Sequence, residues 1–230
     1  MKEKTVIEIK KHRPGLWSMD EYENEYEEMK NKIILADCMD IMKDIPDKYF
    51  DLAIVDPPYG ISVGVNGIVG VNKCAPCTQY KNVEWDFNIP EKKYFEELFR
   101  VSKNQIIWGG NYFIEHLNNS SCMIVWDKDN SGNFADCELA WTSFKTAVRK
   151  VKIRWNGMLQ ENMKDKEKRI HPTQKPVALY RWLLQNYAKP GDKIIDTHSG
   201  SGSLACACHL EKFDFLAIEK DEDYYKASVE

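Results

Sequence analysis

The chain has 230 residues and is 43% hydrophobic, so it can bury one sizeable core but not comfortably two. No apolar run approaches the roughly 18 residues that a membrane span requires, and the charged start, residues 1–11, lacks the apolar segment of a signal peptide. The net charge of −4 argues against indiscriminate binding to polyanions. The seven scattered cysteines fit reduced thiols better than a disulfide framework, so we expect a cytoplasmic protein with no membrane partner.

Residues 1–31 are interpreted as a charged N-terminal extension, and residues 32–230 carry the pattern of one domain. Short apolar runs in that domain each end in polar or glycine-rich residues, as buried strands of a parallel sheet do. Helical patterns at Lys92–Val101 and Pro176–Ala188 lie between some of these runs. The alternation predicts an α/β fold with a mostly parallel sheet, whose ligands bind beyond the carboxyl ends of the strands. The predicted strands are Ile33–Leu35, Leu52–Val55, Gln105–Trp108, Cys122–Trp126, Leu139–Phe144, Lys193–Ile195 and Phe215–Ile218.

The sequence Asp56-Pro57-Pro58-Tyr59 follows directly after one of these predicted strands. Proline restricts Asp56 to extended conformations, and two prolines remove two backbone donors, so this edge offers only acceptors. Two acceptors, the Asp56 carboxylate and a proline carbonyl, suit an exocyclic amino group of a nucleobase. Tyr59 would then stack on the base after the base has left its duplex. The alternative is a structural Pro-Pro turn with a capping aspartate.

Residues 61–85 are rich in glycine and asparagine, and their length favours a mobile active-site loop over a simple connection. They contain Cys74-Ala75-Pro76-Cys77, which has the spacing of a zinc or redox pair. No second cysteine pair or matching histidine pair completes such a site, so we expect no metal.

The segment 145–170 shows no clear periodicity and is interpreted as a short basic insertion. Residues 145–175 hold ten basic and three acidic residues, a net charge of +7. The rest of the chain therefore carries a net charge of −11. Such segregation is typical of a surface that faces phosphates, although a solvated loop with incidental lysines is the alternative. The candidate phosphate contacts are Lys150, Lys152, Arg154, Lys164, Lys166, Lys168 and Arg169.

Near the end of the chain, a predicted strand leads into Asp196, a loop of small residues and a helix predicted from Leu204. Glycines at positions 200 and 202 of this loop let a nucleotide-like ligand approach the backbone closely. Glu219 ends the next predicted strand, where an acidic side chain can accept hydrogen bonds from ribose hydroxyls. An ordinary tight turn is the alternative for the loop taken alone.

Three separate motifs carry a family resemblance through their order. Asp56-Pro57-Pro58-Tyr59 comes first, His171-Pro172-Thr173-Gln174-Lys175-Pro176 follows the basic segment, and the glycine loop comes last. This order resembles that of the beta-group amino-methyltransferases of DNA, over roughly residues 33–230. The resemblance implies a Rossmann-like methyltransferase fold, with a mostly parallel seven-stranded sheet, helices on both faces and a circularly permuted motif order.

The resemblance also implies roles for individual residues. Asp37 matches the acid that contacts the adenine of the cofactor, and Glu219 matches the acid that contacts its ribose. The glycine loop departs from the family's Asp-Pro-Phe-x-Gly-Ser-Gly, because Thr197 and His198 replace the proline and the aromatic residue. The implied catalytic set is Asp56, Pro57, Pro58 and Tyr59, and the implied S-adenosylmethionine site is Asp37, His171, Thr173, Lys175, Asp196, His198, Ser199, Gly200, Gly202 and Glu219.

These implications lead us to expect a site-specific DNA methyltransferase that acts on adenine N6, because an initial Asp commonly accompanies adenine in this family. Double-stranded DNA is the expected partner, and the short insertion leaves room for a homodimer or a second subunit in target recognition. Methylation of cytosine N4, of RNA or of a protein amide are the alternative reactions. A non-catalytic DNA-binding subunit with the same fold is the alternative from another class, and the intact Asp56 and Glu219 argue against it.

Overall fold

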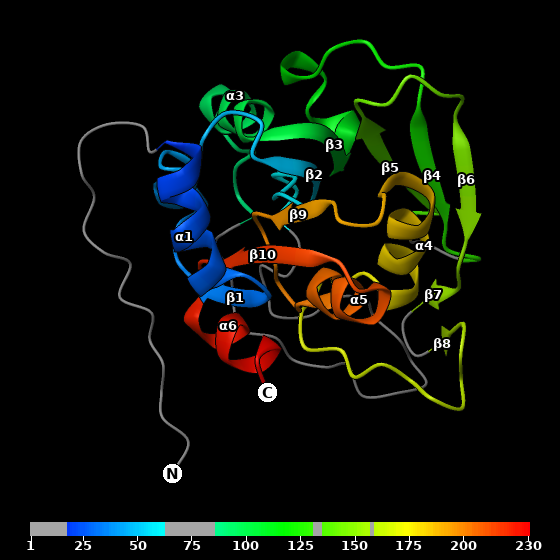
Figure 1. The fold of residues 1–230 in the computed structure, drawn as a ribbon. Coiled ribbons are helices and arrows are strands. Elements are labelled where there is room, and N and C mark those ends of the chain that lie inside the picture. Colours follow the sequence, from blue (N-terminus) through cyan, green and yellow to red (C-terminus); the bar gives the residue numbers. More distant parts are fainter. Residues whose placement is uncertain (1–17, 63–85, 131–134, 157–158) are drawn as a thin grey trace.

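The computed structural model describes residues 18–62, 86–130, 135–156 and 159–230 (Figure 1). The predicted strands correspond to β1 to β5, β9 and β10, and the predicted helices correspond to α3 and α4. In chain order, the elements are α1 (Met19–Met29), β1 (Lys32–Leu35), α2 (Cys38–Met42), β2 (Phe50–Val55), α3 (Lys92–Val101), β3 (Ser102–Trp108), the 3-10 turns η1 (Gly110–Tyr112) and η2 (Ile114–His116), β4 (Met123–Asp127), β5 (Cys137–Thr142), β6 (Arg149–Lys152), β7 (Trp155–Asn156), β8 (Leu159–Gln160), α4 (Val177–Tyr187), β9 (Lys193–Asp196), α5 (Ser203–Glu211), β10 (Asp214–Glu219) and α6 (Glu222–Ser228).

The main sheet has eight strands in the order β1-β10-β9-β2-β3-β5-β4-β6, and β7 pairs with β8 in a separate ribbon. The strands from β1 to β3 pair in parallel, whereas β5 pairs antiparallel with both β3 and β4. A mostly parallel sheet is therefore confirmed, with one strand more than the predicted seven. The additional strand is β6, in the basic segment, where Val151 is the one buried side chain among four. An edge strand of this kind carries no apolar run that would predict it.

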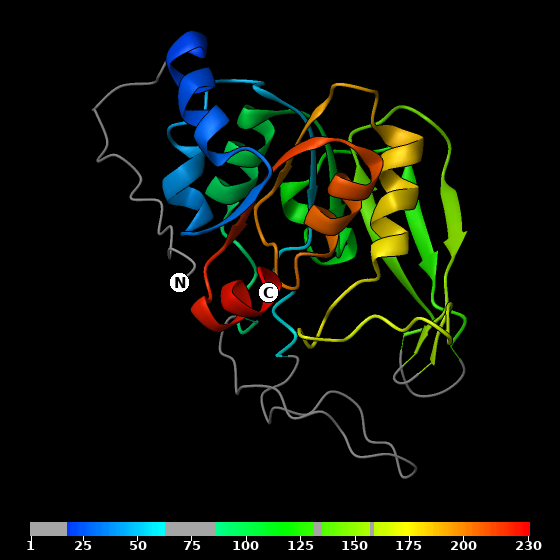
Figure 2. The same ribbon diagram turned by 60° about the horizontal axis from the view of Figure 1, so that its bottom comes forward.

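Helices cover both faces of the main sheet, as predicted, with α1, α2 and α3 on one side and α4 and α5 on the other (Figure 2). The alternation along β2 explains the two cores, because successive side chains of a strand point to opposite faces. Ala53 and Val55 lie in the first core, and Leu52 and Ile54 lie in the second. Since both faces are covered, β2 reads in the sequence as a continuous apolar run.

Residues of the predicted N-terminal extension pack in the core of the domain. Helix α1 has a capping box, in which the Ser18 hydroxyl accepts a hydrogen bond from the Glu21 N–H and the Glu21 carboxylate accepts one from the Ser18 N–H. Tyr22 and Tyr26, one turn apart on α1, are buried in the core. Acidic residues surround these tyrosines in the sequence, so the buried stripe was not recognised.

Two further expectations concern the loop after β2 and the membrane. The predicted mobile loop lies outside the described residues from position 63 to 85, and so do Cys74 and Cys77. Within the described ranges, no helix combines the length and the apolar character that spanning a bilayer requires.

Candidate active site

Acidic side chains stand at the carboxyl ends of four neighbouring strands. Asp37 follows β1, Glu219 ends β10, Asp196 ends β9, and Asp56 follows β2. These strands pair in parallel in that spatial order, so their carboxyl ends meet at one edge of the sheet. The sequence predicts Asp56, Asp196 and Glu219 at strand ends and assigns Asp37 through the family resemblance, and the structure brings the four to one edge.

A cleft of about 1130 Å³ opens along this edge. It joins the two halves of the predicted site, because residues after β2 and residues of the glycine loop line the same cavity. The loop before α3 and Tyr94 of α3 also line it, and neither was singled out in the sequence. The predicted residues that line the cleft are Asp37, Asp56, Pro58, His171, Thr173, Lys175, His198, Ser199, Gly200 and Glu219.

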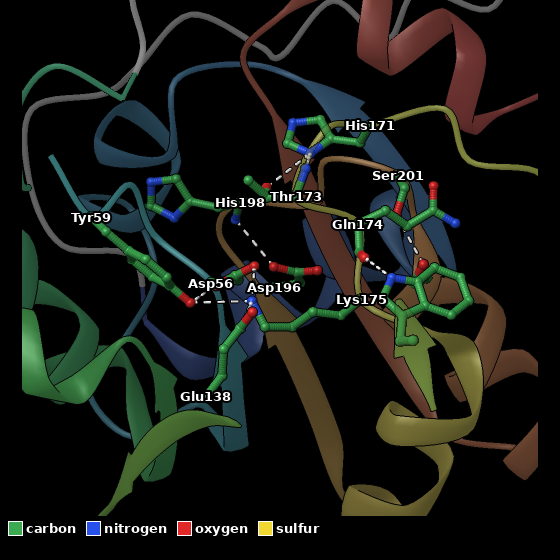
Figure 3. A network of polar contacts seen from close by, with 12 residues as sticks. Asp56, Tyr59, Glu138, His171, Thr173, Gln174, Lys175, Asp196, His198 and Ser201 are labelled. Carbon is green, nitrogen blue, oxygen red and sulfur yellow. Dashed lines mark hydrogen bonds and ion pairs between the residues drawn. The ribbon is translucent and has the colours of Figure 1, made fainter. Parts of the chain in front are cut away.

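The Asp56 carboxylate is held by two donors. Tyr59 donates its hydroxyl proton to Oδ1 at 2.6 Å, and Lys175 Nζ donates to Oδ2 at 2.5 Å (Figure 3). Burial raises the pKa of Asp56, and the charge of Lys175 opposes that shift. Burial alone would lower the pKa of Lys175, but the nearby Asp56 and Glu138 carboxylates outweigh it and raise that pKa. Lys175 is therefore an ammonium ion at neutral pH, in spite of its burial.

The turn after the two prolines is fixed by Asp86, which the sequence analysis missed. Its Oδ1 accepts hydrogen bonds from the backbone N–H groups of Tyr59 at 2.8 Å and Gly60 at 3.0 Å. The Tyr59 ring packs on Gly109, where an added Cβ would lie 2.2 Å from the ring. One face of that ring stacks on Tyr112, with centroids 4.9 Å apart and planes 15° apart. A base that is to stack on this face must displace Tyr112.

The glycine loop is tied to the end of β10. Glu219 Oε2 accepts a hydrogen bond from the Gly200 N–H at 2.6 Å, and Gly200 has a positive φ of 53° that favours glycine. The Ser199 hydroxyl lines the cleft and is buried, without a hydrogen-bond partner in the described part of the chain. Such a group is suited to a polar atom of a ligand. Gly202 instead lines a separate groove, and a Cβ added there would lie 3.0 Å from Ile33 Cδ1.

Three titratable groups behind and beside the glycine loop, Asp196, His198 and His171, are uncharged at neutral pH. Burial raises the pKa of Asp196 to about 8, although the His198 N–H donates to its Oδ1 at 3.1 Å. Burial also lowers the pKa of His198 to about 4 and that of His171 to about 3. The Tyr94 hydroxyl lies 2.7 Å from the Thr197 hydroxyl, which anchors the loop to α3. These three groups therefore add little charge to this wall of the cleft.

The end of the cleft near β1 is charged. Asp37 is the N-cap of α2, where it accepts the Met39 N–H at 2.9 Å, and it pairs with Lys220 Nζ at 2.7 Å. Burial opposes ionisation of Asp37, but the bonds from Lys220 and Met39 outweigh it and lower its pKa. Lys220 also lines the cleft and was missed, although it directly follows Glu219 at a strand end.

Asp127, the last residue of β4, and Asp129 form ion pairs with three cations in the first part of the basic segment. Asp127 Oδ2 lies 3.1 Å from Lys150 Nζ, and Asp129 Oδ1 lies 2.7 Å from Lys152 Nζ. Arg154 donates from Nε to Asp129 Oδ2 at 2.9 Å. Three of the predicted phosphate contacts therefore already have acidic partners.

The second part of the basic segment leads directly into the cleft lining at His171. Lys164, Lys166 and Lys168 are exposed, and none forms an ion pair within the described ranges. The Arg169 guanidinium lies over the Trp155 ring, 4.4 Å from its centroid. Among the predicted phosphate contacts, these lysines are the cations most available to an outside partner.

Comparison with known sequences places this geometry in a family context. A sequence profile of the DNA methylase family, of the N6/N4 type, matches residues 50–230. The type II methyltransferase M.HinfI of Haemophilus influenzae is 26% identical over 84% of this chain and 66% of its own length, so the chain spans just under two thirds of that relative. The type II methyltransferase M2.DpnII of Streptococcus pneumoniae is 24% identical over 86% of this chain and 88% of its own length.

Solved structures share the fold. The M1.HpyAVI–SAM complex superposes with a TM-score of 0.54 at 20% identity and covers 86% of this chain and 97% of its own. The cytosine-N4-specific PvuII DNA methyltransferase gives a TM-score of 0.57 at 13% identity and covers 86% of this chain and 84% of its own. This likeness confirms the predicted methyltransferase fold.

Proposed function

The chain belongs to the N6/N4-type DNA methylase family, and on that premise we propose that it transfers a methyl group from S-adenosylmethionine to an exocyclic amino group of a base in DNA. The observation that carries the proposal is the position of Asp56. This residue, at the turn whose two prolines lack N–H donors, lines the same cleft as the glycine loop. Strands β2 and β9 pair directly, so the acceptor group and the donor lie side by side. The type II names of M.HinfI and M2.DpnII favour a role in restriction–modification.

The lining of the cleft fits S-adenosylmethionine. Glu219 and Asp37 offer carboxylate acceptors at neighbouring strand ends, for ribose hydroxyls and for the adenine amino group. Ser199 offers a buried hydroxyl that has no partner within the described chain, and Gly200 lets a ligand approach the backbone. The fold shared with the M1.HpyAVI–SAM complex supports the same cofactor. When bound, the cofactor supplies an electrophilic methyl group on a sulfonium sulfur.

The protein's own contribution is positioning. Asp56 and the Pro57 carbonyl accept hydrogen bonds from the two N–H groups of the base's amino group and so direct its nitrogen into the cleft. The nitrogen lone pair would take up the methyl group that the cofactor supplies, with the C–S electron pair left on sulfur, and the nitrogen would then release one proton to water. The negative charge of Asp56 stabilises the positive charge that develops on the nitrogen.

We further propose adenine N6 as the acceptor, because the motif begins with Asp56, and we keep cytosine N4 as the alternative. The test is incubation of the protein with unmethylated plasmid DNA and isotope-labelled S-adenosylmethionine, followed by digestion to nucleosides and mass spectrometry. We expect labelled N6-methyldeoxyadenosine. Labelled N4-methyldeoxycytidine would move the acceptor to cytosine, and DNA without label would contradict the methyltransferase activity and favour a non-catalytic subunit.

A further inference from the structure

Lys175 points toward the acceptor end of the cleft, although its motif resembles a cofactor segment. Its side chain is 3% exposed, and Figure 3 shows Nζ between Asp56, Tyr59 and Glu138. Nζ lies 2.5 Å from Asp56 Oδ2, 3.1 Å from the Tyr59 hydroxyl and 3.1 Å from Glu138 Oε2. Asp56 Oδ2 and the Tyr59 hydroxyl accept hydrogen bonds from this ammonium, and Glu138 Oε2 forms an ion pair with it.

The ammonium occupies the place that the proposed reaction requires for the base. Asp56 Oδ1 accepts the Tyr59 hydroxyl proton, so each oxygen of this carboxylate already has one donor before an amino group arrives. Lys175 Nζ is the donor at Oδ2. The ammonium and an incoming amino group are both donors and compete for the same acceptor. A carboxylate oxygen can accept two hydrogen bonds, but the ammonium uses part of the charge of Oδ2, and its departure would leave that charge to the amino group.

Glu138 provides a second acceptor for the departing ammonium. Strand β5 runs antiparallel to its neighbours, so its first residues lie at the edge where the parallel strands end. Lys128, directly after β4, pairs with Glu138 as well. Burial opposes ionisation of Glu138, but Lys175 and Lys128 outweigh it and lower its pKa, so the group is a carboxylate. A buried ammonium can leave one carboxylate only if another is in reach.

We propose that Lys175 binds the Asp56 carboxylate until the amino group of the base arrives, and that Lys175 then moves onto Glu138. The exchange rests on the proposed methyl transfer and replaces hydrogen bonds only, with no covalent bond made or broken. Before the base enters, Lys175 keeps Asp56 oriented. After the exchange, Lys175 and Glu138 neutralise each other, and the charge of Asp56 is free for the amino nitrogen. Lys175 and Glu138 are thus positioning residues that act through Asp56.

The first test is a double-mutant cycle of Glu138→Gln and Lys175→Met, with methyl transfer to unmethylated plasmid DNA as the readout. Glu138→Gln alone should lower kcat/KM for DNA by about tenfold or more, because the ammonium loses its second carboxylate and stays on Asp56. In the Lys175→Met protein, the same replacement should change kcat/KM by less than about twofold, because no ammonium remains to be moved. Equal factors in the two backgrounds would overturn the exchange.

The second test is the pH profile of Lys175→Met, which a purely structural role would leave in place. Without the ammonium, only the Tyr59 hydrogen bond still opposes the effect of burial on Asp56, so the pKa of Asp56 rises further and the acid limb of the rate profile moves to higher pH. At about pH 9 the variant should keep at least about a tenth of the wild-type rate, because Lys175 is displaced during transfer. An unmoved acid limb, or no transfer at that pH, would overturn the proposal. The titratable and charged groups that face Asp56 are Tyr59, Tyr94, Glu138, Lys175, Tyr180 and Asp196.

Lys103→Met is the matched control, because it removes a lysine that lies 2.6 Å from Asp51 at the opposite end of β2. It should leave the rate and the pH profile unchanged. Calorimetry with S-adenosylmethionine should give wild-type affinity, within about twofold, for Glu138→Gln and Lys175→Met. A tenfold or larger loss in Lys175→Met would place Lys175 in the cofactor site and overturn the exchange. If the wild-type protein leaves DNA unmethylated, the proposed function is overturned. If the wild-type protein is active but Glu138→Gln lowers kcat/KM by the same factor with and without Lys175, only the exchange is overturned.

Discussion

Asp56 and Asp196 stand at the ends of neighbouring strands, and only Asp56 has an ammonium ion beside its carboxyl group. Asp56 faces the Lys175 ammonium, which opposes the effect of burial on its pKa. Asp196 is 5% exposed, and burial, with the nearby charges of Asp56 and Glu219, raises its pKa to about 8. Asp196 is therefore a neutral acid at pH 7, and it adds no negative charge behind the glycine loop.

The protonation of Asp196 predicts how stability depends on pH. A carboxyl group with a folded-state pKa of about 8 keeps a proton that the unfolded chain has already released, so its contribution to the unfolding free energy falls as pH rises from about 4 to about 8. Asp196→Asn should flatten the pH dependence of the unfolding free energy in this window. Denaturant titrations at several pH values would measure it, and an unchanged slope would contradict a protonated Asp196.

At the scale of elements, strand β6 and the segment after β8 divide the basic residues into two groups. Lys150 and Lys152 on β6 and Arg154 just after it have acidic partners at Asp127 and Asp129. The lysines at 164, 166 and 168 are exposed, have no ion pair within the described chain and lead into the cleft. We propose that this second group contacts DNA phosphates.

Two triple variants of equal charge test this division. Replacing Lys164, Lys166 and Lys168 with alanine should flatten the dependence of log affinity for DNA on log salt concentration by up to about 2.7, because each phosphate contact contributes roughly 0.9 to the slope. The matched replacement of Lys150, Lys152 and Arg154 should change the slope less, because each of these cations already has an acidic partner. Binding titrations at several salt concentrations would show it, and equal changes in both triples would refute the division.

The sequence predicts elements that are buried on both faces better than elements at an edge. Strand β2 is covered on both sides, and its apolar run identifies it. Strand β6 buries only Val151 and was not predicted. Glu138 was missed for another reason: an apolar run predicts a strand but not the direction in which it runs. Only the antiparallel direction of β5 brings Glu138 to the edge of the site.

At the scale of the whole molecule, chain order and spatial order differ. Strand β2 comes early in the chain and β9 comes late, yet the two are neighbours in the sheet. The predicted motif order, with the acceptor half first, describes the sequence but does not state which side chains meet. Lys175, which the motif assigns to the cofactor half, meets Asp56 across 119 positions of the chain. Contacts of this kind depend on side-chain directions that spacing in the sequence does not encode.

The central claim is that β2 carries the acceptor site while β9 and β10 carry the cofactor site. It is tested most directly by measuring cofactor affinity and methyl-transfer rate on Asp56→Ala, with Glu219→Ala as the comparison. We expect Asp56→Ala to lower the rate by about a hundredfold or more while calorimetry shows wild-type affinity for S-adenosylmethionine. Glu219→Ala should instead weaken cofactor binding by about 1–3 kcal/mol, because it removes a hydrogen-bonding carboxylate from the cleft. If Asp56→Ala weakened cofactor binding as much as Glu219→Ala, the assignment of the two halves would be contradicted.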